Sequence, residues 1–179
     1  MHSIIYDVAV SIDGYISGPG GDISQFAQEG AVVDDYTARL ETYATAIMGR
    51  ATYEFGYRFG MEPGQNPYPH MKTIVFSKSL ELPDSSEITV ERSCDEDAVG
   101  AVRQRSSGPV YLCGGGAFAG SLLMSGLIDT LRMKRAPIVL ADGVRLFGDA
   151  EISPRLEHAE TRDYGGGYLF QEFRVLNEK

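Results

Sequence analysis

The amino-acid sequence predicts an α/β fold, in which a mostly parallel sheet carries helices on both faces and an antiparallel strand pair at one edge. Three observations predict it. Apolar, strand-like runs alternate with helix-like segments through the first three-quarters of the chain. Two of these runs end in a glycine turn that leads into a helix, as in a strand–helix crossover. Two further segments close the chain around Gly165-Gly166-Gly167, which predicts a hairpin.

The first third of the chain supplies two strands and two helices. Ser3–Val10 is an apolar, β-branched run before the turn signal Asp13-Gly14, which predicts a buried strand. Apolar residues at helical spacing predict a helix over Asp34–Ala46. A short strand over Ala46–Gly49 and a brief helix over Ala51–Tyr57 are expected next.

The middle of the chain continues the alternation. Two buried strands are expected over Lys72–Ser77 and Glu87–Glu91. Asp95–Arg105 is expected to form an amphipathic helix, because apolar residues step along one side and acidic residues in the first turn favour the helix dipole. Val110–Cys113 predicts another strand, and the apolar segment Ala117–Leu127 predicts the helix after it.

The last third is expected to be mainly β-structure. The alternation in Thr130–Ala136 predicts a strand, and Glu157–Tyr164 with Tyr168–Leu176 predicts the hairpin. The sequence shows no internal repeat, linker or low-complexity tract. We therefore expect residues 1–179 to form a single domain.

Charge and composition narrow the functional classes. The formal net charge is −9 and the pI is about 4.8, whereas nucleic acids and anionic membranes require clustered Lys and Arg. No segment resembles a secretion signal or a membrane span, so a cytoplasmic location is expected. The two cysteines, Cys94 and Cys113, lack a CxxC spacing, so neither a metal site nor a redox pair is expected.

Three turns at strand ends carry groups that can bind phosphate. The run Gly114–Gly116 lies between a strand and a helix, where free N–H groups and the helix dipole attract anions. Arg50 lies at a second such turn, and Ser77 and Lys78 follow a third strand. Each turn alone is also consistent with a tight turn, a solvated arginine or a polar loop. Because the carboxyl ends of parallel strands meet at one edge, the three turns together predict a site for a dinucleotide.

Five motifs spread over nearly the whole chain are VAVSIDGYISGPGGDIS, IMGRATYE, IVFSKSL, VYLCGGGAFAGSLLMSGLIDTLRM and PIVLADGVRLF. In order and spacing they resemble the dihydrofolate reductase-like superfamily, and more closely the bacterial branch of the RibD C-terminal domain, the reductase of riboflavin biosynthesis. The resemblance implies a three-layer fold with a mixed, mostly parallel eight-stranded sheet. It also implies an NADPH-dependent reductase acting on a small C=N or C=O compound, such as a pteridine, an aminopyrimidine or a related heterocycle.

The resemblance further implies which residues hold NADPH. Backbone groups of Ala9 and Ile16 would meet the nicotinamide, and the loop Ser11–Ser24 would be the mobile lid over it. Lys78 would favour NADPH over NADH through the extra phosphate. The residues expected to hold the remainder of the cofactor come from the three strand-end turns and are Gly49, Arg50, Ala51, Thr52, Ser77, Lys78, Gly114, Gly115, Gly116, Ala117 and Phe118.

The source of the proton and the substrate contacts stay open at this point. Asp34, Asp35 or a water is expected to donate the proton, with Tyr53 as a further candidate that would also contact the substrate. The two aspartates are equally consistent with helix capping. Lys134 and Arg135 would meet a substrate phosphate, as in the riboflavin pathway, and are equally consistent with an ion pair or an exposed edge.

Two features set this chain apart from well-known relatives. It has no tryptophan, although dihydrofolate reductases typically carry one after the covering loop, and it lacks the zinc motifs of the deaminase that is usually fused to the riboflavin reductase. A stand-alone reductase, expected as a homodimer, fits best. The alternatives are a nucleotide-binding homodimer without catalysis, because fold does not establish activity, and a flavin-using or antibiotic-modifying reductase.

Overall fold

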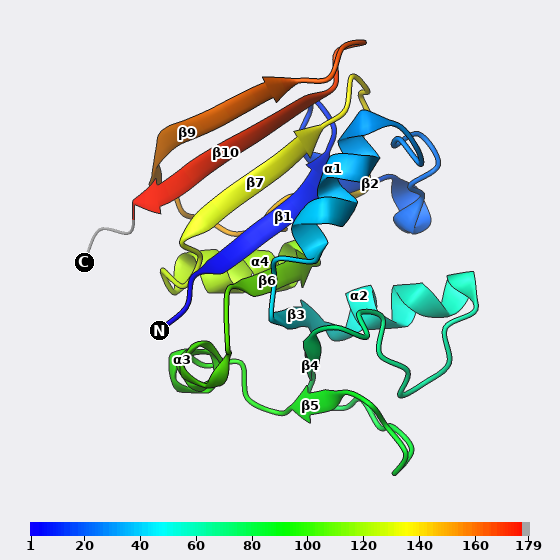
Figure 1. Ribbon diagram of the computed structural model, residues 1–179, viewed down its shortest axis with the longest axis vertical. Helices are drawn as coiled ribbons and strands as arrows, with labels where there is room; N and C mark the ends of the chain where they lie inside the picture. The colour runs from blue at the N-terminus through cyan, green and yellow to red at the C-terminus, as the bar shows by residue number, and fades with distance from the viewer. Residues whose placement is uncertain (177–179) are drawn as a thin grey trace.

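A single eight-stranded sheet runs through the computed structural model, which describes residues 1–176. The strand order is β5-β4-β3-β6-β1-β7-β10-β9, with β9 and β10 at one edge and β5 at the other (Figure 1). All pairings are parallel except those of β10 with β7 and β9, so the predicted mixed, mostly parallel sheet with an antiparallel edge is confirmed. The strands are β1 (Ile4–Val10), β3 (Thr45–Gly49), β4 (Lys72–Phe76), β5 (Thr89–Glu91), β6 (Val110–Gly114), β7 (Thr130–Arg135), β9 (Arg155–Asp163) and β10 (Leu169–Leu176).

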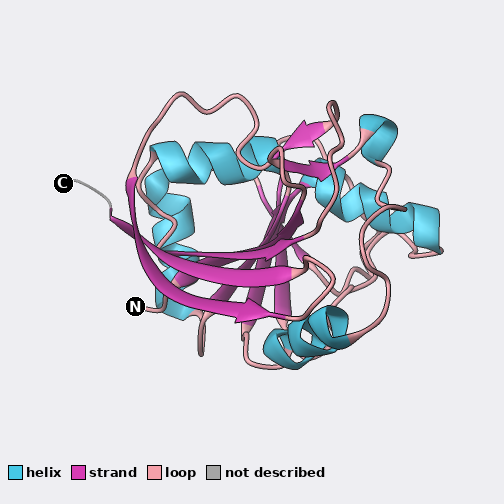
Figure 2. Cartoon of the chain, turned by 90° about the horizontal axis from the view of Figure 1, so that it is seen from above, coloured by secondary structure: helices cyan, strands magenta, loops and turns pink. Residues whose placement is uncertain are grey.

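Helices cover both faces of this sheet (Figure 2). Alternate residues of β1 point to opposite sides, as a strand requires. Ile4 and Tyr6 join a core with α3 and α4, and Ile5 joins a second core with α1 and α2. The helices are α1 (Ala31–Leu40), α2 (Arg50–Phe55), α3 (Glu96–Arg105) and α4 (Gly116–Met124), with short 3₁₀ turns η1 (Pro19–Gly21) and η2 (Gly56–Phe59).

The helix predicted over Asp34–Ala46 is wrong at both ends, because α1 spans residues 31–40. The backbone N–H groups of Thr42 and Tyr43 bond to the carbonyls of Arg39 and Leu40, which closes the last turn early. Tyr43 then leaves the helical spacing and stacks on Tyr111 of β6, with ring centroids 5.1 Å apart. Its apolar character therefore reflects packing on the sheet and not a longer helix.

A small second sheet was missed by the sequence analysis. It pairs β2 (Tyr15–Ser17), inside the segment expected to be a lid, with β8 (Val144–Arg145). Strands of two or three residues carry no periodic signal, and these two are 127 or more residues apart in the chain. The pairing ties the 11–24 segment to the chain that follows β7.

Candidate active site

Two neighbouring cavities lie at the carboxyl ends of the central strands. The larger has a volume of about 650 Å³ and lies among the ends of β1, β3 and β6. The smaller has a volume of about 280 Å³ and lies beside α1 and β7. Ala9, Ile16 and Ile23 line both cavities and form their common wall.

The larger cavity brings together ten of the thirteen residues that the resemblance assigned to the cofactor. Ser77, Lys78 and Gly114 are not among its lining residues. The ten are Ala9, Ile16, Gly49, Arg50, Ala51, Thr52, Gly115, Gly116, Ala117 and Phe118. Segments from four parts of the chain thus meet at one hollow, as expected where parallel strands end.

The glycine turn serves both packing and cavity lining. A Cβ atom on Gly116 would lie 2.1 Å from the Arg145 carbonyl oxygen, so the backbone of β8 requires glycine there. A Cβ on Gly115 would lie 3.0 Å from Thr52 Oγ1, and both residues line the larger cavity. Gly116 is therefore needed by the fold itself, in addition to lining the cavity.

The start of α4 directs donors at the larger cavity. The N–H of Ala119 makes the first bond along the helix, to the Gly115 carbonyl at 2.9 Å. The N–H groups of Gly116, Ala117 and Phe118 precede it and have no acceptor within the helix. Because these three residues line the cavity, the helix N-terminus adds positive potential to one of its walls.

Arg50 and Arg58 supply positive charge to the larger cavity. Arg50 donates through Nε to Glu54 at 2.8 Å and through Nη1 to Ser79 Oγ at 2.9 Å. Arg58 Nη1 donates to the Gly20 carbonyl at 2.6 Å and so holds the 17–23 segment over the cavity. Lys78 immediately precedes Ser79, so it lies beside the Arg50 wall without lining the cavity itself.

The smaller cavity is apolar and aromatic, with one ammonium group. Lys134 enters it from β7, and its Nζ lies 2.9 Å from the centroid of the Tyr36 ring. Its side chain is only 12% exposed. The residues that line this cavity besides the common wall are Phe26, Ala27, Gln28, Val32, Val33, Tyr36, Lys134, Ala136 and Tyr168.

A buried carboxylate lies behind that ammonium group. Asp7 of β1 has a fully buried side chain that accepts bonds from Arg39 Nε at 2.8 Å and from the Tyr43 hydroxyl at 2.9 Å. Asp7 Oδ1 lies 3.7 Å from Lys134 Nζ. Burial lowers the pKa of Lys134 to about 8, although the negative charge of Asp7 opposes that shift.

Neither aspartate expected to donate the proton lies in a cavity. Asp34 is exposed on α1. Asp35 accepts bonds from Arg162 Nη1 at 2.9 Å, from Arg39 and from the Tyr164 hydroxyl. Partial burial opposes ionisation of Asp35, but the Tyr164 bond and the two guanidinium charges keep its pKa below the usual value. Their predicted acid role does not fit this placement, because neither side chain reaches a lined cavity and Asp35 is held as an anion.

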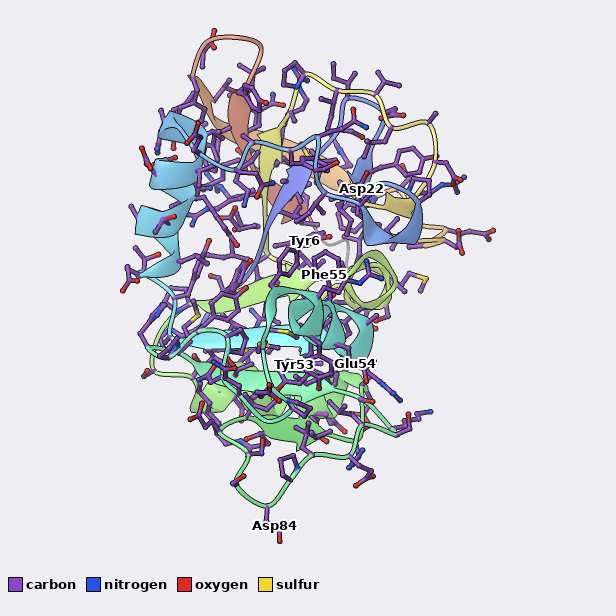
Figure 3. The ribbon with its side chains drawn as sticks, turned by 90° about the vertical axis from the view of Figure 1, so that its right-hand side faces the viewer. Tyr6, Asp22, Tyr53, Glu54, Phe55 and Asp84 are labelled. Atoms are coloured by element: carbon purple, nitrogen blue, oxygen red, sulfur yellow. The ribbon has the colours of Figure 1, made fainter. Side chains whose placement is uncertain are left out.

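Tyr53 and Arg135 also lie outside both cavities. The Tyr53 hydroxyl donates to the Gln65 carbonyl at 3.0 Å and accepts from the Gly64 N–H at 2.9 Å. In Figure 3, Tyr53 and Phe55 lie on opposite sides of α2, and only Phe55 lines the larger cavity. The tyrosine therefore anchors the loop after α2, and its expected contact with a substrate does not fit this position.

Sequence reasoning missed the residues that shape the smaller cavity. Asp7 carried a usable signal, since it is the one charged residue in the apolar strand Ile4–Val10 and an acid there requires a buried partner. Tyr36, Phe26 and Tyr168 carried none, because an aromatic residue that lines a cavity and one that fills a core look alike in a sequence.

The described part of the chain contains no group of three or more His, Cys, Asp or Glu side chains placed to hold a metal ion. Among residues 1–176, no helix combines the length and the apolar character needed to cross a bilayer.

Comparison with known proteins identifies relatives that share this fold and the family to which the chain belongs. The chain is 25% identical over 177 residues to the uncharacterized Bacillus subtilis (strain 168) protein YyaP, covering 93% of this chain and 91% of YyaP. A Shewanella sp. PV-4 structure, provisionally assigned to riboflavin biosynthesis, matches with a TM-score of 0.82 at 23% identity and covers 99% of this chain and 100% of its own.

The dihydrofolate reductase of Enterococcus faecalis, solved in complex with NADP(H), has the same fold. It matches with a TM-score of 0.67 at 18% identity and covers 98% of this chain and 97% of its own. The sequence profile of the RibD C-terminal domain matches residues 2–170, nearly the whole chain. The chain belongs to the RibD C-terminal domain family.

Proposed function

We propose that this protein is an NADPH-dependent reductase of a small C=N or C=O compound. The observation that carries the proposal is the pair of cavities that share a wall at Ala9, Ile16 and Ile23. A reductase must hold a long, anionic cofactor against a smaller acceptor, and two joined cavities of different chemistry suit these two tasks. The family and the fold neighbours support a reductase of this general type.

The residues of the larger cavity fit a nicotinamide dinucleotide. The N-terminus of α4 and the guanidinium of Arg50 would meet the pyrophosphate, and the bare backbone at Gly115 allows close approach. Ala9 and Ile16 would lie beside the nicotinamide at the common wall. When bound, the reduced nicotinamide supplies a hydride. Lys78, next to the Arg50–Ser79 contact, would meet the 2′-phosphate and favour NADPH over NADH.

The smaller cavity fits a compact, flat acceptor better than a sugar phosphate. Its walls are mainly Ile, Val, Ala and aromatic side chains, which suit a planar apolar ring. Lys134 is the one cation among its lining residues within 1–176. A phosphate usually takes several charged partners, so we propose a heterocycle such as a pteridine, an aminopyrimidine or a related carbonyl compound.

The 17–23 segment serves as the cover of the site in this proposal. Gly20, Gly21 and Ile23 line the larger cavity, and Phe55 of α2 packs near Gly21. The Arg58–Gly20 bond fastens this cover at its tip. Closing the site excludes water from the transferred hydride and strengthens the interaction of nearby charges with the acceptor.

Two measurements test the proposal. Calorimetric titration with NADPH and NADH measures binding, and loss of reduced-nicotinamide absorbance with 7,8-dihydropterin or a naphthoquinone measures reduction. Binding with turnover is the expected result. Binding of NADPH without turnover of any acceptor would favour the alternative, a non-catalytic nucleotide-binding protein. Absence of binding to both nucleotides contradicts the proposal. The expected homodimer is tested separately by light scattering, against the 19.5 kDa mass of one chain.

A further inference from the structure

The Lys134 ammonium is placed to act on a molecule in the smaller cavity. β7 pairs with β1 so that Lys134 lies directly beside Ala9, a residue of the common wall. Its side chain lines the smaller cavity and lies against the face of Tyr36. An acceptor bound in this cavity would present its polar edge to Nζ, close to the boundary with the larger cavity.

The groups around Lys134 hold its amine in place. Asp7 lies on the side away from the cavity, 3.7 Å from Nζ, and is itself fixed by Arg39 and Tyr43. Asp7 is therefore an ion-pair partner of the amine, and the face of the Tyr36 ring is a second partner for its charge.

The titratable groups facing Lys134 come from three elements. They are Asp7 on β1, Tyr36 and Arg39 on α1, and Cys113 on β6. Burial of the Lys134 amine lowers its pKa most, the negative charge of Asp7 raises it, the positive charge of Arg39 lowers it further, and Cys113 raises it. The result, a pKa of about 8, lets the amine hold a proton at neutral pH and release it readily.

Two of the other polar groups of the smaller cavity, Tyr36 and Gln28, are less suited to donate a proton. The Tyr36 hydroxyl bonds to the Tyr111 hydroxyl, and burial raises its pKa well above the usual value. Gln28 does not ionise, and its amide donates to the carbonyls of Ile23 and Phe26. Asp34 and Asp35 do not line the cavity.

We propose that Lys134 is the catalytic proton donor and that Asp7 is its positioning residue, an inference that rests on the reductase function proposed above. As the acceptor carbon gains a hydride, its C=O or C=N double bond becomes single, and the heteroatom takes a proton from Lys134 Nζ. The amine is left neutral and regains a proton from water when the site opens. The substrate is accordingly a neutral or anionic ring compound that offers an acceptor oxygen or nitrogen to an ammonium group.

The first experiment needs no substrate. Lysines are ¹³C-dimethylated in the folded protein and titrated by NMR. The expected result is one lysine resonance, separate from that of the N-terminal amine, with a midpoint near 8; it is absent in Lys134→Met and present in Lys72→Met, which removes an exposed lysine of β4. Asp7→Asn is expected to lower that midpoint, because it removes the charge that favours the ammonium form. A Lys134 midpoint near the ordinary value of about 10.4 overturns the proposal.

The second experiment separates proton donation from simple charge. Wild type, Lys134→Met, Lys134→Arg and Lys72→Met are compared for NADPH affinity and for kcat with the probe acceptors. Both Lys134 variants are expected to keep the NADPH dissociation constant and to lose kcat roughly 10²–10⁴-fold. Wild-type kcat is expected to fall as pH rises through about 8, and neither Lys134 variant is expected to retain that fall.

The outcomes distinguish the two proposals. If wild type binds no NADPH, the reductase function itself fails. If the wild type reduces a probe and Lys134→Arg has the same kcat as the wild type, the amine acts only as a fixed charge. The proton-donor role is then overturned. An unchanged pH profile in Lys134→Met has the same consequence.

Discussion

The buried Asp7 allows a sharp test of what holds the site together. Asn is close to Asp in shape, but in Asp7→Asn an uncharged amide replaces the carboxylate. Asp7 now accepts from Arg39 Nε at 2.8 Å, from Arg39 Nη2 at 3.2 Å and from the Tyr43 hydroxyl at 2.9 Å. One of these donors would face an NH₂ group in the variant, and Arg39 and Lys134 would lose their shared counter-charge.

Removing one partner of a buried ion pair costs about 3–5 kcal/mol. Arg39 keeps Asp35 as a second carboxylate partner, and the Asn side chain keeps one acceptor oxygen. Both effects favour the lower end, so we expect Asp7→Asn to lower the free energy of unfolding by about 3 kcal/mol. With an m-value of about 2 kcal/mol/M in urea, the midpoint would fall by about 1.5 M.

Equilibrium urea unfolding followed by far-UV circular dichroism measures this change. Asp34→Asn is the matched control, because Asp34 is exposed on α1 and its loss is expected to cost no more than about 0.5 kcal/mol. The reasoning is refuted if the two variants shift the midpoint equally. Such a result would mean that the Asp7 carboxylate contributes no more than a surface charge.

Three further predictions concern the cofactor and the tyrosines. Gly115→Val places a branched side chain beside Thr52 Oγ1 and is expected to lower NADPH affinity at least about 100-fold, or about 2.7 kcal/mol, with an unchanged circular dichroism spectrum; calorimetry showing intact affinity contradicts it. Lys78→Gln is expected to weaken NADPH binding about tenfold and to spare NADH, as one lost charge-assisted bond implies; equal losses for both nucleotides would count against a 2′-phosphate contact. Burial raises the pKa of several tyrosines above the usual value of about 10, so the folded state keeps protons that the unfolded state releases, and stability is fully present below about pH 10 and lost as pH rises beyond it. The tyrosinate absorbance contributed by these residues should therefore appear together with unfolding and not before it; they are Tyr6, Tyr36, Tyr43, Tyr68 and Tyr111, five of the ten tyrosines of the chain.

The centre of the main sheet could be predicted from sequence because strands β1, β4 and β6 are mostly buried. Such strands are continuous apolar runs, and β1, β4 and β6 were found within a few residues of their ends. The helix α3 was equally clear, because Asp95 caps it by accepting from the Ala98 N–H and acidic residues occupy its first turn. Elements that depend on contacts between distant parts of the chain were not predicted, and the β2–β8 pair is the main example.

The candidate site also has a part that local sequence patterns predict and a part that they do not. The glycine turn and Arg50 follow directly from local motifs, and the structure brings them to one cavity. The smaller cavity depends on Tyr36, Lys134 and Tyr168, which come from a helix, a strand and a hairpin turn. No local pattern links them. Lys134 was singled out only for its charge, and its burial against a ring could not be read without the pairing of β7 with β1.

We expect the wall formed by Ala9, Ile16 and Ile23 to couple binding in the two cavities thermodynamically, because the same three residues line both. A ligand in either cavity would restrict the motion of these three side chains. The ligand that binds second would then lose less conformational entropy than it would on binding alone. By linkage, the factor by which the acceptor tightens the hold on the dinucleotide must equal the factor by which the dinucleotide tightens the hold on the acceptor.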